Sequence, residues 1–312
     1  MKKITMQSNN QLTFDEAFDK FIRKCKVKNL TEKSIRSYEQ KIRPFRQFCN
    51  EHKISLDEIN GNTIDDFIVW VRDTHKANDI SVNSYLRTVR AFTYYCMDNN
   101  YMNNFKVHIP KATKKMKETY TDKELSILLK KPNKKYCTFT EFKTWAFENF
   151  LLGTGVRLST ALDVKIKDIK FDDELIFLGQ TKNRIQQYIP LSKSLALVLK
   201  EYLEVRGGKD DDYLFCNNYG RKANERTFQQ MVKDYNNNRG IDRSSIHAFR
   251  HTFARLYILN GGNAFLLQKL MGHSDISVTK EYVDLFGTDL AVNYDRLNPL
   301  DNLSNRGQYI RM

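Results

Sequence analysis

The sequence predicts a mainly α-helical protein with a small β-sheet, divided into two domains. The chain has 312 residues, more than one ordinary compact domain of about 100 to 200 residues needs. Most of its apolar residues recur at three- and four-residue spacing, as they do on the buried face of a helix. The exception is a region over residues 174–190, where two short runs rich in β-formers are separated by a polar turn.

Residues 13–105 are predicted to form a helical domain of about four helices. The helical pattern begins at about Thr13. Thr31 is placed to cap a second helix, whose apolar positions continue without a break as far as Phe48. Residues 1–12 are polar and are predicted to be a flexible N-terminus.

N-terminal signals mark the later helices of this domain. Ser55, followed three residues on by Glu58, has the spacing of a capping box. A further helix is expected from about Thr63, and Ser81 is the expected N-cap of the last one.

A basic linker is predicted over residues 106–118, because Pro110 and the lysines after it disfavour a helix. A second domain, with a C-terminal tail, is then assigned to residues 119–312. Its first helix is marked by a second capping box, formed by Thr121 and Glu124.

The second domain is predicted to be mixed. A long buried helix ends at Gly153 or Gly155, and a new helix starts at Arg157. Strands are expected at about 174–178 and 186–190, joined by a hairpin turn. Helices fill the rest of the domain.

Composition narrows the class of protein. The chain has 51 Lys and Arg against 37 Asp and Glu, a net charge of +14, and such an excess favours a polyanionic partner, most often nucleic acid. No apolar run reaches the roughly 18 residues of a membrane span, and no signal-peptide core follows the first lysines. The five cysteines are scattered without a CxxC pair, so we expect a cytoplasmic protein with free thiols.

Basic side chains on the expected helices of the first domain and in the linker are candidate phosphate contacts. The alternative is a solvated charged face, which most helical runs of lysine and arginine are. The DNA-binding candidates are Lys33, Arg36, Arg43, Arg87, Arg90, Lys114 and Lys115.

The segment HAFRH, residues 247–251, concentrates unusual chemistry. In a helix His247, Arg250 and His251 share one face, which would be cationic and would suit an anion or a metal opposite it. Zinc is disfavoured, because the chain offers neither an HExxH glutamate nor an evident third ligand. For His251 we favour a structural role within the core.

Several motifs together resemble one family. They are TGVR at 154–157, QTKN at 180–183, HAFRH at 247–251, LMGH at 270–273, and the tyrosine of SVTKEYV, Tyr282. Their order and spacing resemble those of tyrosine recombinases of the phage-integrase and Xer type. The resemblance implies a helical, SAM-like core-binding domain followed by a mixed α/β catalytic domain.

The resemblance also implies the reaction. Tyr282 would attack a DNA phosphodiester and leave a 3′-phosphotyrosine, which stores the bond energy for rejoining without ATP. Arg157 and Arg250 would grip the non-bridging oxygens, and His273 would donate to them. The implied catalytic residues are Arg157, Lys182, His247, Arg250, His273 and Tyr282.

Two further roles follow from the same resemblance. Lys182 would protonate the leaving 5′-oxygen, and His247 would act as base or positioning group for the tyrosine proton. Neither a metal nor another cofactor is required. One departure is Thr160, which stands where the family often has an acidic residue that holds the first arginine.

The implied partner is double-stranded DNA, clamped between the two domains. Four protomers would act on two DNA sites, and the unbound protein would be a monomer or dimer. Accessory DNA-bending or directionality proteins are further partners that the family allows, and no membrane is involved. The outcome would be integration or excision of a mobile element, or resolution of multimers.

Two other functional classes stay open on the sequence alone. A type IB topoisomerase shares the tyrosine, arginine and lysine chemistry, and a catalytically dead relative would only bind DNA. Beyond the tyrosine, Leu290, Tyr294 and Leu297 could form one face of a short helix. That helix would dock on a neighbouring protomer, as in the family, or pack within its own chain.

Overall fold

The computed structural model describes residues 12–112, 118–179, 186–217 and 219–272, together with Asp275, Thr279 and Tyr282. The chain divides into two compact units, Met1–Lys115 and Met116–Met312. Each unit has a hydrophobic core of its own. None of the helices in the described part of the chain has the length and apolar character that a membrane crossing needs.

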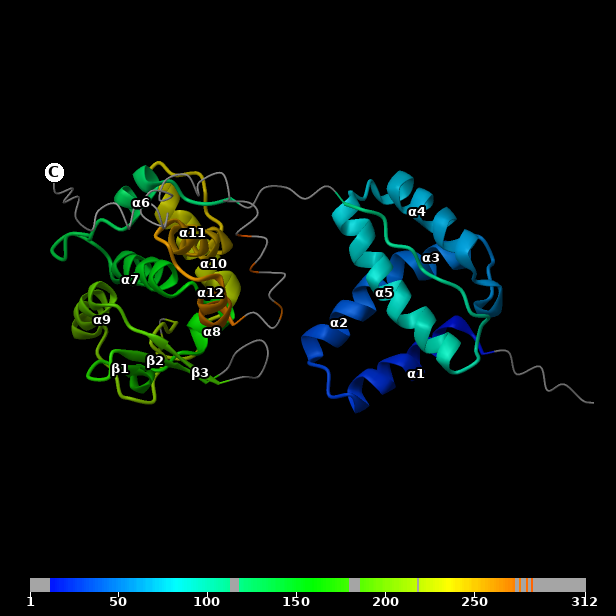
Figure 1. Cartoon of the computed structure of the whole chain (residues 1–312), viewed down its shortest axis with the longest axis horizontal. Helices are drawn as coiled ribbons and strands as arrows, with labels where there is room; N and C mark the ends of the chain where they lie inside the picture. The colour runs from blue at the N-terminus through cyan, green and yellow to red at the C-terminus, as the bar shows by residue number, and fades with distance from the viewer. Residues whose placement is uncertain are drawn as a thin grey trace, which may run out of the picture. The chain divides into compact units, whose positions relative to one another are not determined.

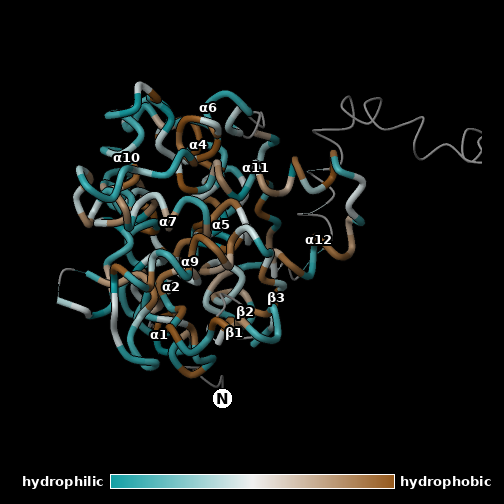
Figure 2. The backbone as a smooth tube through the Cα atoms, turned by 90° about the vertical axis from the view of Figure 1, so that its left-hand side faces the viewer, coloured by the Kyte–Doolittle hydropathy of each residue, from teal (hydrophilic) through white to brown (hydrophobic). Residues whose placement is uncertain are grey.

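The first unit is all helical. Along the backbone of the chain, brown hydrophobic and teal hydrophilic stretches follow one another (Figure 2). The core is largely aromatic: Phe45 packs edge-on against Phe67, and Phe21 packs edge-on against Phe92. The helices are α1 (Phe14–Val27), α2 (Glu32–Lys41), α3 (Arg43–Glu51), α4 (Gly61–His75) and α5 (Asp79–Asp98), with a short 3-10 helix at Leu56–Glu58.

Local capping signals are confirmed at several helix starts. The Thr31 hydroxyl accepts a hydrogen bond from the backbone N–H of Ser34, as predicted, and Thr13, where the helical pattern was expected to begin, forms a capping box with Glu16. Ser55 and Glu58 also form their box, although it opens only a 3-10 turn. These signals act within one helical turn, which is why they can be predicted without the tertiary structure.

Two predictions about this unit are wrong. The single helix expected as far as Phe48 is broken at Ile42 into α2 and α3, with Pro44 in the first turn of α3. Proline has no N–H and its ring clashes with the preceding turn, so it fits a helix start better than an interior. The last helix begins earlier than expected, because the Asn78 side chain, and not Ser81, is its cap and accepts from the Ser81 N–H.

The segment after α5 packs on this core. Val107 is buried among the residues of the first unit, and the side-chain amide of Asn83 donates to the Pro110 carbonyl at 2.9 Å. Residues 106–110 therefore belong structurally to the first unit, although the sequence suggested a linker from 106 onward. The two units divide between Lys115 and Met116.

The second unit combines helices with a small sheet, as predicted, but the sheet has three antiparallel strands where the sequence indicated two. The strands follow one another in the order β1-β2-β3, and Ile176 of β2 pairs with Ile169 on one side and Ile189 on the other. The elements are α6 (Asp122–Leu128), α7 (Phe139–Thr154), α8 (Leu158–Asp163), a 3-10 turn at Ile166–Asp168, β1 (Ile169–Lys170), β2 (Leu175–Leu178), β3 (Gln187–Pro190), α9 (Lys193–Arg206), α10 (Glu225–Asn237), α11 (Ile246–Leu259) and α12 (Ala264–Met271).

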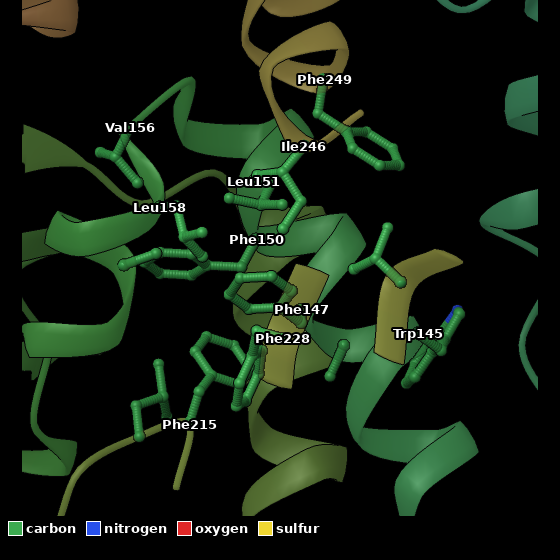
Figure 3. Close-up of a cluster of buried hydrophobic side chains, with 14 of the residues drawn as sticks. Trp145, Phe147, Phe150, Leu151, Val156, Leu158, Phe215, Phe228, Ile246 and Phe249 are labelled. Carbon is green, nitrogen blue, oxygen red and sulfur yellow. The ribbon is translucent and has the colours of Figure 1, made fainter. Parts of the chain in front are cut away.

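Helix α7 is the centre of this unit. It packs against α9, α10 and α11, and it lies between α6 and the sheet, which occupy opposite edges of the unit (Figure 1). Its Phe147 and Phe150 both meet Phe215 edge-on in the core shown in Figure 3. A helix buried on nearly every side gives the residues at its C-terminal end a rigid support.

Helix α7 also buries a carboxyl group, that of Glu148, without a hydrogen-bond partner among the described residues. Glu148 is fully buried, and neither of its carboxylate oxygens has a hydrogen-bond partner in the described structure. Burial raises the pKa of the Glu148 carboxyl well above its usual value, and the charge of Arg239 opposes this only in part. The folded protein therefore holds this group protonated at pH values where the unfolded chain ionises it.

We expect the folding stability of the wild-type protein to fall as pH rises because of Glu148, and we expect Glu148→Gln to remove this fall. The pKa of Glu148 is higher in the folded protein than in the unfolded chain. Its contribution to folding stability is therefore fully present below the pKa of the unfolded chain. It is lost as pH rises toward the folded pKa, by up to about 1.4 kcal/mol per pH unit. The variant should gain stability relative to wild type between pH 5 and pH 8.

Urea unfolding followed by fluorescence can test this, because Trp145 lies on the same helix. Glu204→Gln, at an exposed position of α9, is the matched control and should show no such trend. A Glu148→Gln difference that stays constant from pH 5 to pH 8 would contradict the prediction.

Candidate active site

The site begins at the turn that ends α7. Gly155 closes this helix in the left-handed conformation, with φ of +62°. The ring of Phe253 comes so close that a Cβ atom at this position would lie 2.2 Å from a ring carbon. Both facts require glycine here. The turn then places Arg157 at the N-cap of α8, so its backbone is held by two helices.

Two arginines tie the turns around the site together. The Nη1 of Arg250, on α11, donates to the Gly155 carbonyl at 2.6 Å, and its Nη2 donates to the Met271 carbonyl at 2.8 Å. The Nη1 of Arg157 donates to the Gly272 carbonyl at 3.3 Å. The C-terminal ends of α7 and α12 are therefore both bonded to the Arg250 guanidinium, and Arg157 adds a further bond to the end of α12.

The structure also shows the surroundings of Thr160, the residue that departs from the family pattern. Thr160 is buried on α8, where the family often has an acidic side chain. Here Arg157 is oriented by the backbone carbonyl of Gly272. A carbonyl carries no net charge, so this bond positions the guanidinium without neutralising it.

Burial removes water from both guanidiniums, and most completely from that of Arg250. Arg250 is only 5% exposed, and burial together with the nearby charge of Arg157 lowers the pKa of Arg250 to about 10. Burial also lowers the pKa of Arg157. Both groups still carry their charge at neutral pH, so the site concentrates positive charge in surroundings that screen it poorly.

Tyr282 lies against these cations. Its side chain is 2% exposed and packs with Ile258, Leu267 and Met271. Its oxygen also forms a hydrogen bond with Arg250, which acts against the lowering of the pKa of Arg250. A phenol beside two guanidiniums is stabilised as it gains negative charge.

The histidine that contacts this phenol is His251. The Nδ1 atom of His251 lies 2.9 Å from the Tyr282 hydroxyl oxygen, and the two rings are tilted by 45°. The sequence favoured a structural role within the core for His251, and the structure places its ring beside the tyrosine oxygen. The signal was its place in HAFRH next to Arg250, but the helix pattern alone could not show which histidine meets Tyr282.

His247 occupies a different part of the site. It retains an exposed surface on α11, yet the protein around its ring lowers its pKa by desolvation, and the charges of Arg250 and Arg157 lower it further. Glu225 acts in the opposite direction. His247 is thus kept neutral at pH 7, on the side of the guanidiniums.

Not every predicted catalytic residue is among the residues that the structure describes. Lys182 and His273 lie outside the described residues, as do Leu290, Tyr294 and Leu297. The described structure therefore brings together Arg157, His247, Arg250 and Tyr282.

The predicted phosphate contacts of the first unit are exposed where the structure describes them. Helix α2, which bears Lys33 and Arg36, packs against α5, which bears Arg87 and Arg90. All four side chains are exposed, as is that of Arg43. Arg36 also pairs with Glu32 at 3.6 Å. Lys114 and Lys115 lie outside the described residues.

Comparison with known proteins covers nearly the whole chain. A family model described as the phage integrase family matches residues 118–288, and one described as a phage integrase SAM-like domain matches residues 13–119. Tyrosine recombinase XerD of Halalkalibacterium halodurans is 26% identical over 300 residues, which cover 92% of this chain and 99% of the relative.

Solved structures show the same fold. The Tn1549 transposon integrase in complex with transposon right end DNA aligns with a TM-score of 0.72 at 19% identity, covering 92% of this chain and 99% of that one. A lambda integrase tetramer bound to a Holliday junction aligns with a TM-score of 0.70 at 17% identity, covering 88% and 78%. At these identities the likeness is one of fold.

Proposed function

Because the chain belongs to the phage integrase family of tyrosine recombinases, we propose that it cuts and rejoins duplex DNA at specific sites with Tyr282 as the nucleophile. The observation that carries this proposal is the surroundings of the tyrosine oxygen. It lies 2.9 Å from a histidine nitrogen, beside the buried guanidinium of Arg250 and within the field of Arg157.

In the proposed reaction the Tyr282 oxygen forms a bond to phosphorus, and the bond from phosphorus to the 5′-oxygen breaks. Negative charge builds on the non-bridging oxygens as phosphorus becomes five-coordinate. Arg157 and Arg250 are cations held in place before the reaction, so they stabilise this transition state more than the substrate. The 3′-phosphotyrosine conserves the bond energy, and rejoining therefore needs no ATP.

The remaining roles are proposals that rest on the family motifs. Lys182 is the acid that protonates the leaving 5′-oxygen, and His273 donates a hydrogen bond to the phosphate. His247, kept neutral by its surroundings, positions or accepts a proton at the site. In this scheme cations of the protein stabilise the phosphate charge, and neither a metal nor a cofactor takes part.

We also propose how the protein assembles. Both units would contact one DNA duplex, with the basic segment after Pro110 connecting them, and four protomers would act on two DNA sites from a monomeric or dimeric pool. The tetramer of lambda integrase on a Holliday junction supports this arrangement. The reaction would take place in the cytoplasm and serve a mobile element or the resolution of multimers, with accessory DNA-bending or directionality proteins biasing its outcome.

The proposed phosphate contacts of the first unit predict a salt effect. Replacing Arg87 and Arg90 together by alanine should weaken DNA binding about equally on all sequences. It should also reduce the slope of log K against log salt by about 2, since each lost phosphate contact releases about one counterion fewer. Fluorescence anisotropy over a series of salt concentrations measures both quantities.

A charge-matched control separates contact from net charge. Lys130 and Lys135 are exposed basic residues of the second unit outside the proposed set. Their double alanine variant lowers the net charge by the same amount. If both double variants change the slope equally, Arg87 and Arg90 act only through the overall charge.

The function itself can be tested with nicked duplexes that tile the DNA flanking the gene. On such substrates the cut fragment diffuses away and the covalent complex accumulates, so it can be seen on a denaturing gel. An adduct at one position supports site-specific recombination, whereas adducts on many sequences would favour a type IB topoisomerase. Tight binding without any adduct would favour a DNA-binding protein that has lost catalysis.

A further inference from the structure

We propose that His251 accepts the proton of the Tyr282 hydroxyl when this oxygen attacks phosphorus. The proposal rests on the proposed function and assigns a residue to its proton transfer. It starts from the 2.9 Å distance between His251 Nδ1 and the Tyr282 oxygen.

The surroundings of Tyr282 require a protein group for this step. A phenol has an ordinary pKa of about 10, so it is protonated at neutral pH and must lose its proton as it becomes an ester oxygen. The side chain is only 2% exposed and is packed among apolar residues of α11 and α12. Bulk water therefore reaches this oxygen poorly, and a neighbouring side chain is the natural acceptor.

Two side chains are identified at the Tyr282 oxygen, namely Arg250 and His251. A guanidinium has only donors and stays charged, so Arg250 can stabilise a phenolate but cannot take its proton. An imidazole can accept through one nitrogen while the other carries hydrogen. His251 is therefore the group of the two that can act as the base.

One tautomer of His251 gives this contact the direction that proton transfer needs. A neutral His251 with its hydrogen on Nε2 presents the Nδ1 lone pair to the phenolic hydrogen. As the bond from the Tyr282 oxygen to phosphorus forms, the phenolic proton moves to Nδ1. The electrons of the breaking bond leave with the 5′-oxygen, which takes a proton from Lys182, the acid proposed above. In rejoining, Lys182 takes that proton back as the 5′-hydroxyl attacks phosphorus, and His251 returns its proton to the departing tyrosine oxygen.

On α11, His251 lies directly after one of the two arginines that are proposed to bind the phosphate. Arg250 is the preceding residue and is fixed by the Gly155 and Met271 carbonyls. The base and one phosphate-binding cation are thus neighbours on one buried helix. His247, one turn earlier, lies within the electrostatic influence of both guanidiniums and can serve a different step.

The test compares His251→Asn with wild type on the nicked duplex that the wild-type protein cleaves. The asparagine oxygen can replace Nδ1 as a hydrogen-bond acceptor, but it cannot take a proton. We expect DNA binding and the melting temperature to be retained and single-turnover cleavage to fall by about 100-fold or more. Cleavage within a few-fold of wild type would overturn the proposal.

A second measurement separates proton transfer from positioning. Fluorinated tyrosine at position 282 has a more acidic phenol and needs less help from a base, so it should relieve much of the His251→Asn defect. The matched control is His247→Asn, whose defect should not be relieved. An unrelieved His251→Asn defect, or relief only in His247→Asn, would assign the proton to another group.

Loss of folding does not prevent the test. If His251→Asn lowers the melting temperature or DNA binding, His251→Ala with added imidazole replaces it. Recovery of cleavage that rises with imidazole concentration supports the proposal, and lack of recovery in a folded, DNA-binding variant contradicts it. Failure of the wild-type protein to form any adduct would instead contradict the proposed function.

Discussion

Replacing Tyr282 by phenylalanine is expected to abolish covalent attachment to DNA while leaving DNA binding intact. The variant keeps the ring that packs with Ile258, Leu267 and Met271 and loses only the oxygen that attacks phosphorus. Loss of the hydrogen bond to His251 should cost about 1 kcal/mol of stability. Cleavage should fall by at least about 1,000-fold, since no other group replaces a missing nucleophile.

Denaturing gels of the nicked-duplex reaction measure this loss, and a gel-shift assay on the same DNA checks binding. Tyr257→Phe is the matched control, because Tyr257 packs on the same hydrophobic cluster and has no proposed role. It should form the adduct at the wild-type rate. An adduct that persists in Tyr282→Phe would mean that a different residue is the nucleophile.

The sequence was most informative where structure is local. The capping boxes at Thr121 and at Ser55 involve residues three positions apart, and both are present. The end of α7 at Gly155 was likewise one of the two predicted, because a left-handed C-cap favours glycine. Interactions within one turn need no knowledge of the rest of the fold.

The predicted helix boundaries were wrong where two nearby residues gave equally good signals for a helix start or where the apolar spacing continued across a helix break. Ser81 and Asn78 are both good N-caps, and the side chain of Asn78 accepts from the N–H of Ser81 itself. An apolar spacing that continued through Ile42 concealed the helix break next to Pro44. The pattern records which face is buried, and that face continues across the break.

The site shows a different limit. Spacing and family resemblance pointed to Arg157 and Arg250, but not to the carbonyls that hold them. Those carbonyls belong to Gly155, Met271 and Gly272, at the ends of helices distant in sequence. The pairing of His251 with the tyrosine depends on the same meeting of α11 and α12, so only the folded structure distinguishes it from His247.

Arg250→Lys should be nearly as damaging as loss of the nucleophile, although it keeps the charge. In Arg250 two separate nitrogens bind the Gly155 and Met271 carbonyls, and the guanidinium also bonds the Tyr282 oxygen. A single ammonium nitrogen cannot reproduce this flat fork, nor bind two oxygens of one phosphate in the same plane. We expect cleavage to fall by about 100- to 1,000-fold, with a loss of about 1 to 3 kcal/mol in stability from the buried carbonyls left unpaired.

Single-turnover cleavage and thermal unfolding together separate the two effects of Arg250→Lys. Arg255→Lys, five residues further along α11 and only partly buried, is the matched control and should change neither by much. If Arg250→Lys cleaves within tenfold of wild type, charge alone would be sufficient at this position. If it instead loses cleavage while keeping full stability, the carbonyl bonds would be dispensable and the guanidinium would act on the phosphate alone. The expected loss of both follows from one feature of the structure: the same guanidinium that meets the nucleophile also holds together the helix ends that form the site.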